Sequence, residues 1–184
     1  TGPVRNPHDP SRTTGGSSSG SGALVTAGIV DMAIGGDQGG SIRMPASWCG
    51  IYGLKPTYGL VPYTGIMPIE ITLDHTGPMA RTVHDIAMLL EVLAGPDGLD
   101  PRQQAGLHSQ VYTQTLTGNI RGLRIGIVEE GFGWDVSEKD VDESVREAAQ
   151  GFEKLGAFVK KVSIPWHLDG LHIWNGIAIE GPTL

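Results

Sequence analysis

Residues 36–43 read Gly36-Asp37-Gln38-Gly39-Gly40-Ser41-Ile42-Arg43, with apolar segments on both sides of this turn. Consecutive glycines let successive backbone N–H groups converge on one point, which is how a backbone nest holds an anion. The anion can be a bound phosphate, although the Gly-Lys-Ser/Thr ending of a P-loop is absent. It can also be the oxygen of a carbonyl attacked by Ser41. In that case the N–H groups of Gln38, Gly39 and Gly40 form an oxyanion hole.

The segments around this turn alternate between helical and strand patterns. A helix over 83–93 is the clearest, because its apolar residues share one face, Thr82 can cap it and Gly95-Pro96 stops it. Residues 123–162 read as a strand, a helix and a returning strand, which is a βαβ unit. Further helices are expected over 23–30 and 41–48, and further strands over 32–35 and 51–54. This alternation predicts an α/β fold.

Composition restricts the possible partners and the compartment. The 184 residues fit one domain or part of a larger one, and 13 Lys and Arg against 20 Asp and Glu give a net charge of −7. An acidic chain is not expected to bind nucleic acid or an anionic membrane surface. Asp31 interrupts the longest apolar run, so no membrane span is expected. A single cysteine cannot form an internal disulfide, which favours the cytoplasm.

A second Gly/Ser turn precedes the first in the chain, and it reads Gly15-Gly16-Ser17-Ser18-Ser19-Gly20. It contains the G-x-S-x-G pattern of a nucleophile elbow, centred on Ser18, but no strand pattern leads into it. A flexible linker also fits this composition. A serine nucleophile needs a base, and none of the six histidines lies near either turn in sequence, so the residues alone leave the base open.

Taken together, several motifs in order resemble the amidase signature family. Besides the two turns, they are Met44-Pro45-Ala46, Cys49-Gly50-Ile51-Tyr52-Gly53-Leu54-Lys55-Pro56-Thr57, Asp74-His75-Thr76-Gly77-Pro78 and Arg81-Thr82-Val83-His84-Asp85. The interval between Ser17 and Ser41 also matches the family's spacing, and the resemblance runs at least from Gly2 to Asp100. It implies Ser41 as the acyl nucleophile, Ser17 in a cis peptide bond as the bridging serine, and a lysine base upstream of Thr1. Lys55 belongs to a different motif and is not that base.

The resemblance also implies a reaction, hydrolysis of carboxylic acid amides to the acid and ammonia, with no metal and no other cofactor. Residues 61–65 and 100–103 resemble the bacterial amidases that accompany nitrile hydratases. Gln38 stands where the tRNA-dependent amidotransferase subunits usually carry Thr, and Ser19 replaces a glycine that is common in the family. The alternatives are a glutaminase like that of the tRNA-dependent amidotransferases and a non-catalytic module that binds an anion or a nucleotide. By resemblance, the expected partners are a small amide and a second copy in a homodimer.

We therefore expect residues 1–184 to be a fragment of the amidase signature fold, a mixed twisted sheet with helices on both sides. The catalytic serine core is expected over 13–60 and the βαβ unit over 123–162. Thr1 is not an initiator residue, so the chain is interpreted as part of something longer and is expected to be nearly inactive alone.

Three other groups of residues favour structural roles. Cys49 in an apolar turn is expected to be buried packing rather than a nucleophile. Asp37 and Arg43 flank the proposed oxyanion hole and are expected to form an ion pair that holds the turn. His167, Asp169 and His172 have a spacing too loose for a metal site, and a surface loop is expected there.

Overall fold

The computed structural model describes residues 2–180, which divide into two compact units. One unit contains the residues up to Leu116 together with residues 177–180, and it carries both Gly/Ser turns. The other unit comprises Thr117–Gly176. No helix within the described residues is long and apolar enough to cross a membrane.

A three-stranded antiparallel sheet lies in the first unit, in the order β1 (Met32–Asp37), β3 (His75–Ala80), β2 (Tyr52–Gly53). The central strand β3 was not among the expected strands, because Gly77 and Pro78 argue against a strand. Pro78 is tolerated because β2 pairs only with Met79 and Ala80, and the Pro78 carbonyl still accepts the N–H of Leu54 at 3.0 Å.

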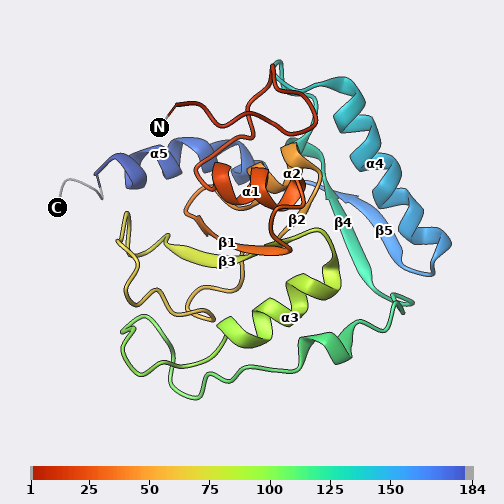
Figure 1. Ribbon diagram of the computed structural model, residues 1–184. Helices are drawn as coiled ribbons and strands as arrows, with labels where there is room; N and C mark the ends of the chain where they lie inside the picture. The colour runs from red at the N-terminus through yellow and green to blue at the C-terminus, as the bar shows by residue number, and fades with distance from the viewer. Residues whose placement is uncertain (1, 181–184) are drawn as a thin grey trace. The chain divides into compact units, whose positions relative to one another are not determined.

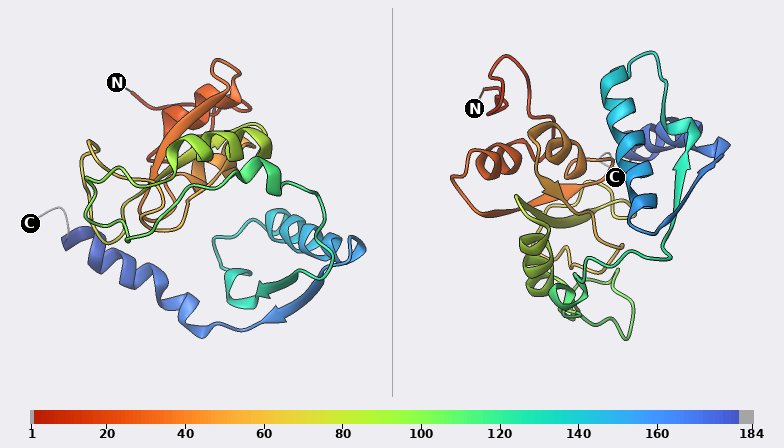
Figure 2. Two further views of the ribbon diagram at one scale, coloured as in Figure 1. Left: turned by 90° about the horizontal axis from the view of Figure 1, so that it is seen from below. Right: turned by 90° about the vertical axis from the view of Figure 1, so that its right-hand side faces the viewer.

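Helices cover both faces of this sheet. Figures 1 and 2 show α1 (Ser19–Thr26) and α2 (Arg43–Cys49) on one face and α3 (Val83–Leu93) on the other. The buried core between sheet and helices contains Ile42, Ala46 and Met79. The site-bearing turns therefore lie at the edge of a packed core.

Most helix boundaries agree with the sequence patterns, with one exception. Thr82 caps α3 by accepting the N–H of Asp85 at 3.1 Å, and Gly50 ends α2 in the left-handed conformation at φ 67°. The first helix was expected over 23–30 but occupies Ser19–Thr26. It begins inside the Gly/Ser run, so that run is a helix start rather than a linker.

The second unit contains a parallel pair of strands, β4 (Arg124–Val128) and β5 (Phe158–Val162), joined by α4 (Lys139–Lys154). Ile125 lies opposite Val159 in the register. This is a strand–helix–strand unit over the range in which the sequence predicts one. The described part of the chain also contains three short 3-10 helices: η1 (Tyr112–Thr115), η2 (Glu129–Gly131) and η3 (Pro165–Asp169).

The region after β5 differs from the loop expected around His167, Asp169 and His172. His167 and Asp169 lie in η3, and His172 lies in α5 (Gly170–Glu180), which begins in the second unit. Pro165 stands in the first turn of η3, a position where its missing N–H costs nothing. The apolar residues after Gly170 then continue as a helix.

Candidate active site

The two Gly/Ser turns lie against each other, and Ser18 is the residue that joins them. Its backbone N–H donates to the carbonyl oxygen of Ser41 at 3.2 Å. Its hydroxyl accepts the N–H of Gly36 at 3.1 Å and donates to the Gly36 carbonyl oxygen at 3.2 Å. Ser18 is thus engaged in structure, although the sequence pattern placed it at the centre of a nucleophile elbow.

Ser17 and Ser41 are placed by these contacts, one on each turn. The peptide bond between Gly16 and Ser17 is cis, in agreement with what the resemblance implied. Ser17 is exposed, and Ser41 is half-buried and lies two residues before Arg43, the first residue of α2. Among residues 2–180, neither hydroxyl takes part in a hydrogen bond, and this includes any bond between the two. Neither hydroxyl is therefore held by another group of the described residues.

Asp37, the last residue of β1, holds the glycine turn in shape. Its side chain is fully buried and accepts the backbone N–H groups of Gly40 at 2.7 Å and Ile42 at 3.2 Å. The Arg43 guanidinium adds two hydrogen bonds, at 3.0 Å and 2.9 Å. Burial alone raises the pKa of the Asp37 carboxyl, but the bonds from Arg43, Gly40 and Ile42 hold that pKa below its usual value. The expected structural ion pair is confirmed.

The backbone N–H groups of this turn differ in how they are used. The Gly40 N–H, assigned to the oxyanion hole from the sequence, points at Asp37 in this structure. Within residues 2–180, no acceptor engages the N–H of Gly39 or that of Ser41. The Ser41 N–H is not among the donors predicted from the sequence, although its place just before a helix is a signal for such a donor.

The Gln38 side chain points away from the backbone turn toward two other residues. Its Nε2 donates to Asp74 Oδ1 at 2.8 Å and to the Tyr63 hydroxyl at 3.2 Å. Asp74 is 1% exposed, and its carboxylate also accepts the backbone N–H groups of Ile69 and Glu70. This contact has no signal in the sequence, because 36 positions separate Gln38 from Asp74.

Lys55 and Cys49 have local partners. Lys55 Nζ donates to the Pro56 carbonyl oxygen at 3.0 Å, and burial, followed by the charge of Arg43, lowers its pKa. Cys49 is fully buried, with Sγ 3.8 Å from the Thr14 carbonyl oxygen, and burial raises the pKa of its thiol. The expectation of buried packing for Cys49 is confirmed, since a thiol with a raised pKa is a poor nucleophile.

Among the described residues there is no group of three His, Cys, Asp or Glu side chains that could hold a metal ion. The described residues of the candidate site supply hydroxyls, backbone N–H groups and an ion pair between the buried Asp37 and the half-exposed Arg43.

Comparison with known proteins assigns this arrangement to a family. The family model described as Amidase matches residues 1–182. The chain belongs to the amidase signature family. The resemblance read from the sequence motifs is thereby confirmed.

Relatives of this amidase signature chain include hydrolases and amidotransferase components. It is 54% identical over 181 residues to an enantioselective amidase of Rhodococcus rhodochrous, an alignment covering 97% of this chain and 35% of that protein. Its fold matches the crystal structure of a glutamyl-tRNA(Gln) amidotransferase subunit from Thermotoga maritima with a TM-score of 0.92 and 39% identity, over 98% of this chain and 39% of that one. It matches the peptide amidase of Stenotrophomonas maltophilia with a TM-score of 0.86 and 35% identity, over 97% and 37% of the two chains.

The fold is thus the amidase signature fold, as expected. The chain spans about a third of the length of the curated relatives that it matches.

Proposed function

We propose that the intact protein is a serine amidase that hydrolyses carboxylic acid amides to the acid and ammonia. One observation carries the proposal: the turn bearing Ser41 is hydrogen-bonded, through Ser18, to the turn bearing the cis peptide bond of Ser17. This contact puts the hydroxyls of Ser17 and Ser41 on neighbouring turns, beside the N–H groups of Gly39 and Ser41, which have no acceptor among residues 2–180.

In the proposed reaction, Ser41 Oγ attacks the carbonyl carbon of R–CO–NH2 and its proton passes to Ser17. Because a serine hydroxyl is a weak nucleophile near neutral pH, Ser17 must in turn be relieved of a proton by a base. We assign that base to the lysine that the family resemblance places upstream of Thr1.

The carbonyl oxygen becomes negative as the Ser41 Oγ–C bond forms. In our proposal it accepts hydrogen bonds from the turn over Gln38, Gly39 and Gly40, as the sequence analysis assigns. In this structure the Gly39 N–H has no acceptor among residues 2–180, whereas the Gly40 N–H already serves Asp37. The loss of one such donor typically costs about 3 kcal/mol of transition-state stabilisation.

Collapse of the tetrahedral intermediate breaks the C–N bond, and the nitrogen leaves as ammonia after taking a proton from Ser17, which the protonated lysine then replaces. Water then attacks the ester carbonyl of the Ser41 acyl-enzyme, releases R–COOH and returns the proton to Ser41. Every bond and proton in the cycle is accounted for without a cofactor.

A glutaminase that works within a tRNA-dependent amidotransferase is the second candidate. The structural similarity to a component of such an enzyme favours it, whereas the higher sequence identity to a hydrolase favours the simple amidase. The two differ in their need for partner chains, because a simple amidase turns over alone.

The deciding experiment is an ammonia-release assay of the intact protein on aliphatic and aromatic amides, with Ser41→Ala as the comparison. Turnover that disappears in Ser41→Ala, together with labelling of Ser41 by a fluorophosphonate, would support the amidase. Turnover only of glutamine, and only after partner chains are added, would point to the amidotransferase. A protein that neither turns over nor is labelled, yet is stabilised by phosphate in a thermal melt, would indicate an anion-binding module.

A further inference from the structure

The side chain of Gln38 is held at both hydrogens of its amide nitrogen. A carboxamide NH2 group has two donors, and here one goes to Asp74 Oδ1 at 2.8 Å and the other to the Tyr63 hydroxyl at 3.2 Å. The backbone of the same residue belongs to the turn before Ser41. A displacement of the side chain is therefore transmitted to that turn.

The two partners of Gln38 are themselves fixed. Asp74 is buried and bound by the backbone N–H groups of Ile69 and Glu70, at 3.0 and 3.2 Å. A buried carboxylate needs its donors, so the Gln38 amide is a costly bond for Asp74 to lose.

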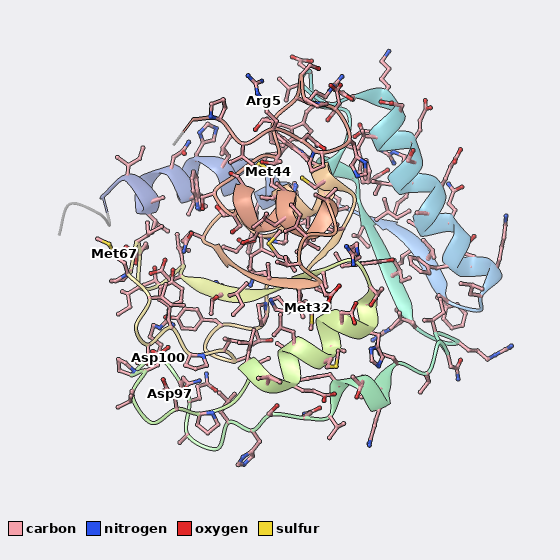
Figure 3. All side chains as sticks on the ribbon, in the orientation of Figure 1. Arg5, Met32, Met44, Met67, Asp97 and Asp100 are labelled. Carbon is pink, nitrogen blue, oxygen red and sulfur yellow. The ribbon has the colours of Figure 1, made fainter. Side chains whose placement is uncertain are left out.

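Tyr63 is anchored from the other side. Its backbone N–H donates to Asp100 Oδ2 at 2.8 Å, and its ring lies 4.9 Å from the Arg102 guanidinium carbon. Arg102 and Asp100 form an ion pair at 2.7 Å, with 8% and 3% of their side chains exposed. Figure 3 labels Asp100 in the loop that follows α3. Tyr63, Asp74, Asp100 and Arg102, together with Thr64, form the polar part of the lining of a depression of about 240 Å³.

We propose that the Gln38 side chain is a positioning residue, which fixes the turn before Ser41 by tying it to Asp74 and Tyr63. The inference rests on the proposed amidase function and extends it from the backbone of Gln38 to its side chain. Oxyanion donors must lie about 2.7–3.1 Å from the developing charge, and a misplacement of about 1 Å can cost on the order of 10²-fold in rate. Because these bonds strengthen in the transition state, loss of the anchor lowers kcat and leaves KM nearly unchanged.

The main test compares Gln38→Met with Gln104→Met in the intact protein, by steady-state amide hydrolysis. Methionine is close to glutamine in length and has no N–H donor, and Gln104 is an exposed glutamine remote in sequence from the turn. For Gln38→Met, kcat is expected to fall about 10- to 100-fold with KM changed less than about threefold. Gln104→Met is expected to match the parent. An unchanged kcat, or a change confined to KM, would overturn the inference.

Gln38→Glu adds a pH readout that a merely structural role would not produce. The introduced carboxylate would face the Asp74 carboxylate. As the pH falls, the introduced carboxyl gains a proton that it can donate to Asp74. The activity of Gln38→Glu relative to that of the parent should therefore rise as the pH falls. A ratio of Gln38→Glu activity to parent activity that is the same at all pH values would contradict the inference. The titratable and charged groups around this position are Asp74, Tyr63, Asp100 and Arg102 on the facing loops, His75 on β3, Lys55 after β2, and Asp37 and Arg43 on its own turn and α2.

Amide hydrogen exchange of the peptide covering residues 38–41 decides the inference without any turnover. Faster exchange in Gln38→Met than in Gln104→Met is the expected result, and equal exchange would overturn it. If Gln38→Met does not fold, Tyr63→Phe replaces it, because that change deletes only one hydroxyl. A parent protein without amidase activity would disprove the proposed function, yet the exchange experiment would still decide the role of Gln38.

Discussion

Asp37 and Arg43 form a two-pronged ion pair in which the carboxylate is fully buried and the guanidinium is half exposed. The same carboxylate accepts backbone N–H groups of the turn, so the pair fixes the backbone on either side of Ser41. The positive charge of Arg43 compensates the buried negative charge of Asp37, and the Asp37 carboxylate can therefore hold the turn from inside the protein.

Asp37→Asn is expected to lower the free energy of unfolding by about 1.5–3 kcal/mol, because hydrogen bonds to a charged acceptor are lost. Arg43→Lys keeps the charge but lacks the planar fork, and it should cost less than Asp37→Asn. Urea denaturation of the intact protein measures both. Equal stability of Asp37→Asn and the parent would show that the pair does not hold the turn.

Ser17 and Ser18 are neighbours for which we expect opposite consequences of substitution. Ser17→Ala should leave stability nearly unchanged and lower kcat by about 10²- to 10⁴-fold, the usual range for a group that transfers a proton. Ser18→Ala should lower the free energy of unfolding by about 1–2 kcal/mol, because it removes the two hydroxyl bonds to Gly36. Thermal melts and ammonia release separate the effects, and a large loss of stability in Ser17→Ala would argue against a chemical role.

Lys55→Met tests whether the base lies elsewhere. Loss of a general base costs at least about 10²-fold in rate, whereas removal of Lys55 should leave most of the activity. Fluorophosphonate labelling of Ser41 in the intact protein reports this directly. A loss of labelling as complete as in Ser41→Ala would make Lys55 the base and overturn our assignment.

The buried pair of Asp100 and Arg102 predicts a loss of stability in acid. The Arg102 guanidinium holds the pKa of the Asp100 carboxyl well below its usual range. A lowered pKa in the folded state stabilises the protein above the unfolded pKa, about 3.9, and this contribution disappears as the pH falls below it. Near pH 7, the free energy of unfolding of Asp100→Asn should be about 3–5 kcal/mol lower than that of the parent. In acid, this free energy should change less with pH in Asp100→Asn than in the parent. Denaturation midpoints measured from neutral pH down to about pH 2 provide the check.

Gly77 tests how closely β3 approaches its neighbour. A Cβ atom there would lie 2.2 Å from the carbonyl oxygen of Leu54, a backbone atom that cannot move aside. Gly77→Ala should therefore cost about 3 kcal/mol or more. Gly20, in α1, has open space around its Cα, and Gly20→Ala should raise stability by about 0.5–1 kcal/mol. Similar melting temperatures for the two variants would refute this account of the packing.

Local sequence patterns were sufficient to predict a helix or strand where that element depends mainly on its own residues. The helix α3 follows from its apolar face and Thr82, and the parallel pair β4 and β5 follows from β-branched residues around α4. The strand β3 could not be predicted, because Gly77 and Pro78 have low strand propensity and only the pairing with β1 makes them extended. The helix α1 begins earlier than expected because the Gly/Ser run serves as both turn and helix start.

The positions of the proposed site residues come from sequence motifs, whereas the contacts of these residues are seen only in the structure. The spacing of Ser17 and Ser41 came from motifs, and the ion pair of Asp37 and Arg43 came from their places beside the turn. The bonds from Gln38 to Asp74 and Tyr63 join segments far apart in sequence, and no periodicity encodes them. The use of the Gly40 N–H by Asp37 likewise depends on the conformation of the turn.

Ser18 ties the carbonyl of Ser41 and both backbone groups of Gly36 to the turn that carries Ser17. A substrate that displaces one of these turns must therefore displace the other turn as well. Under the proposed function, we expect these hydrogen bonds to limit how far Ser41 and Ser17 can move apart when a substrate binds. If the proposed function holds, we expect substitutions in the surrounding loops to change which amides bind without changing the relation between these two serines.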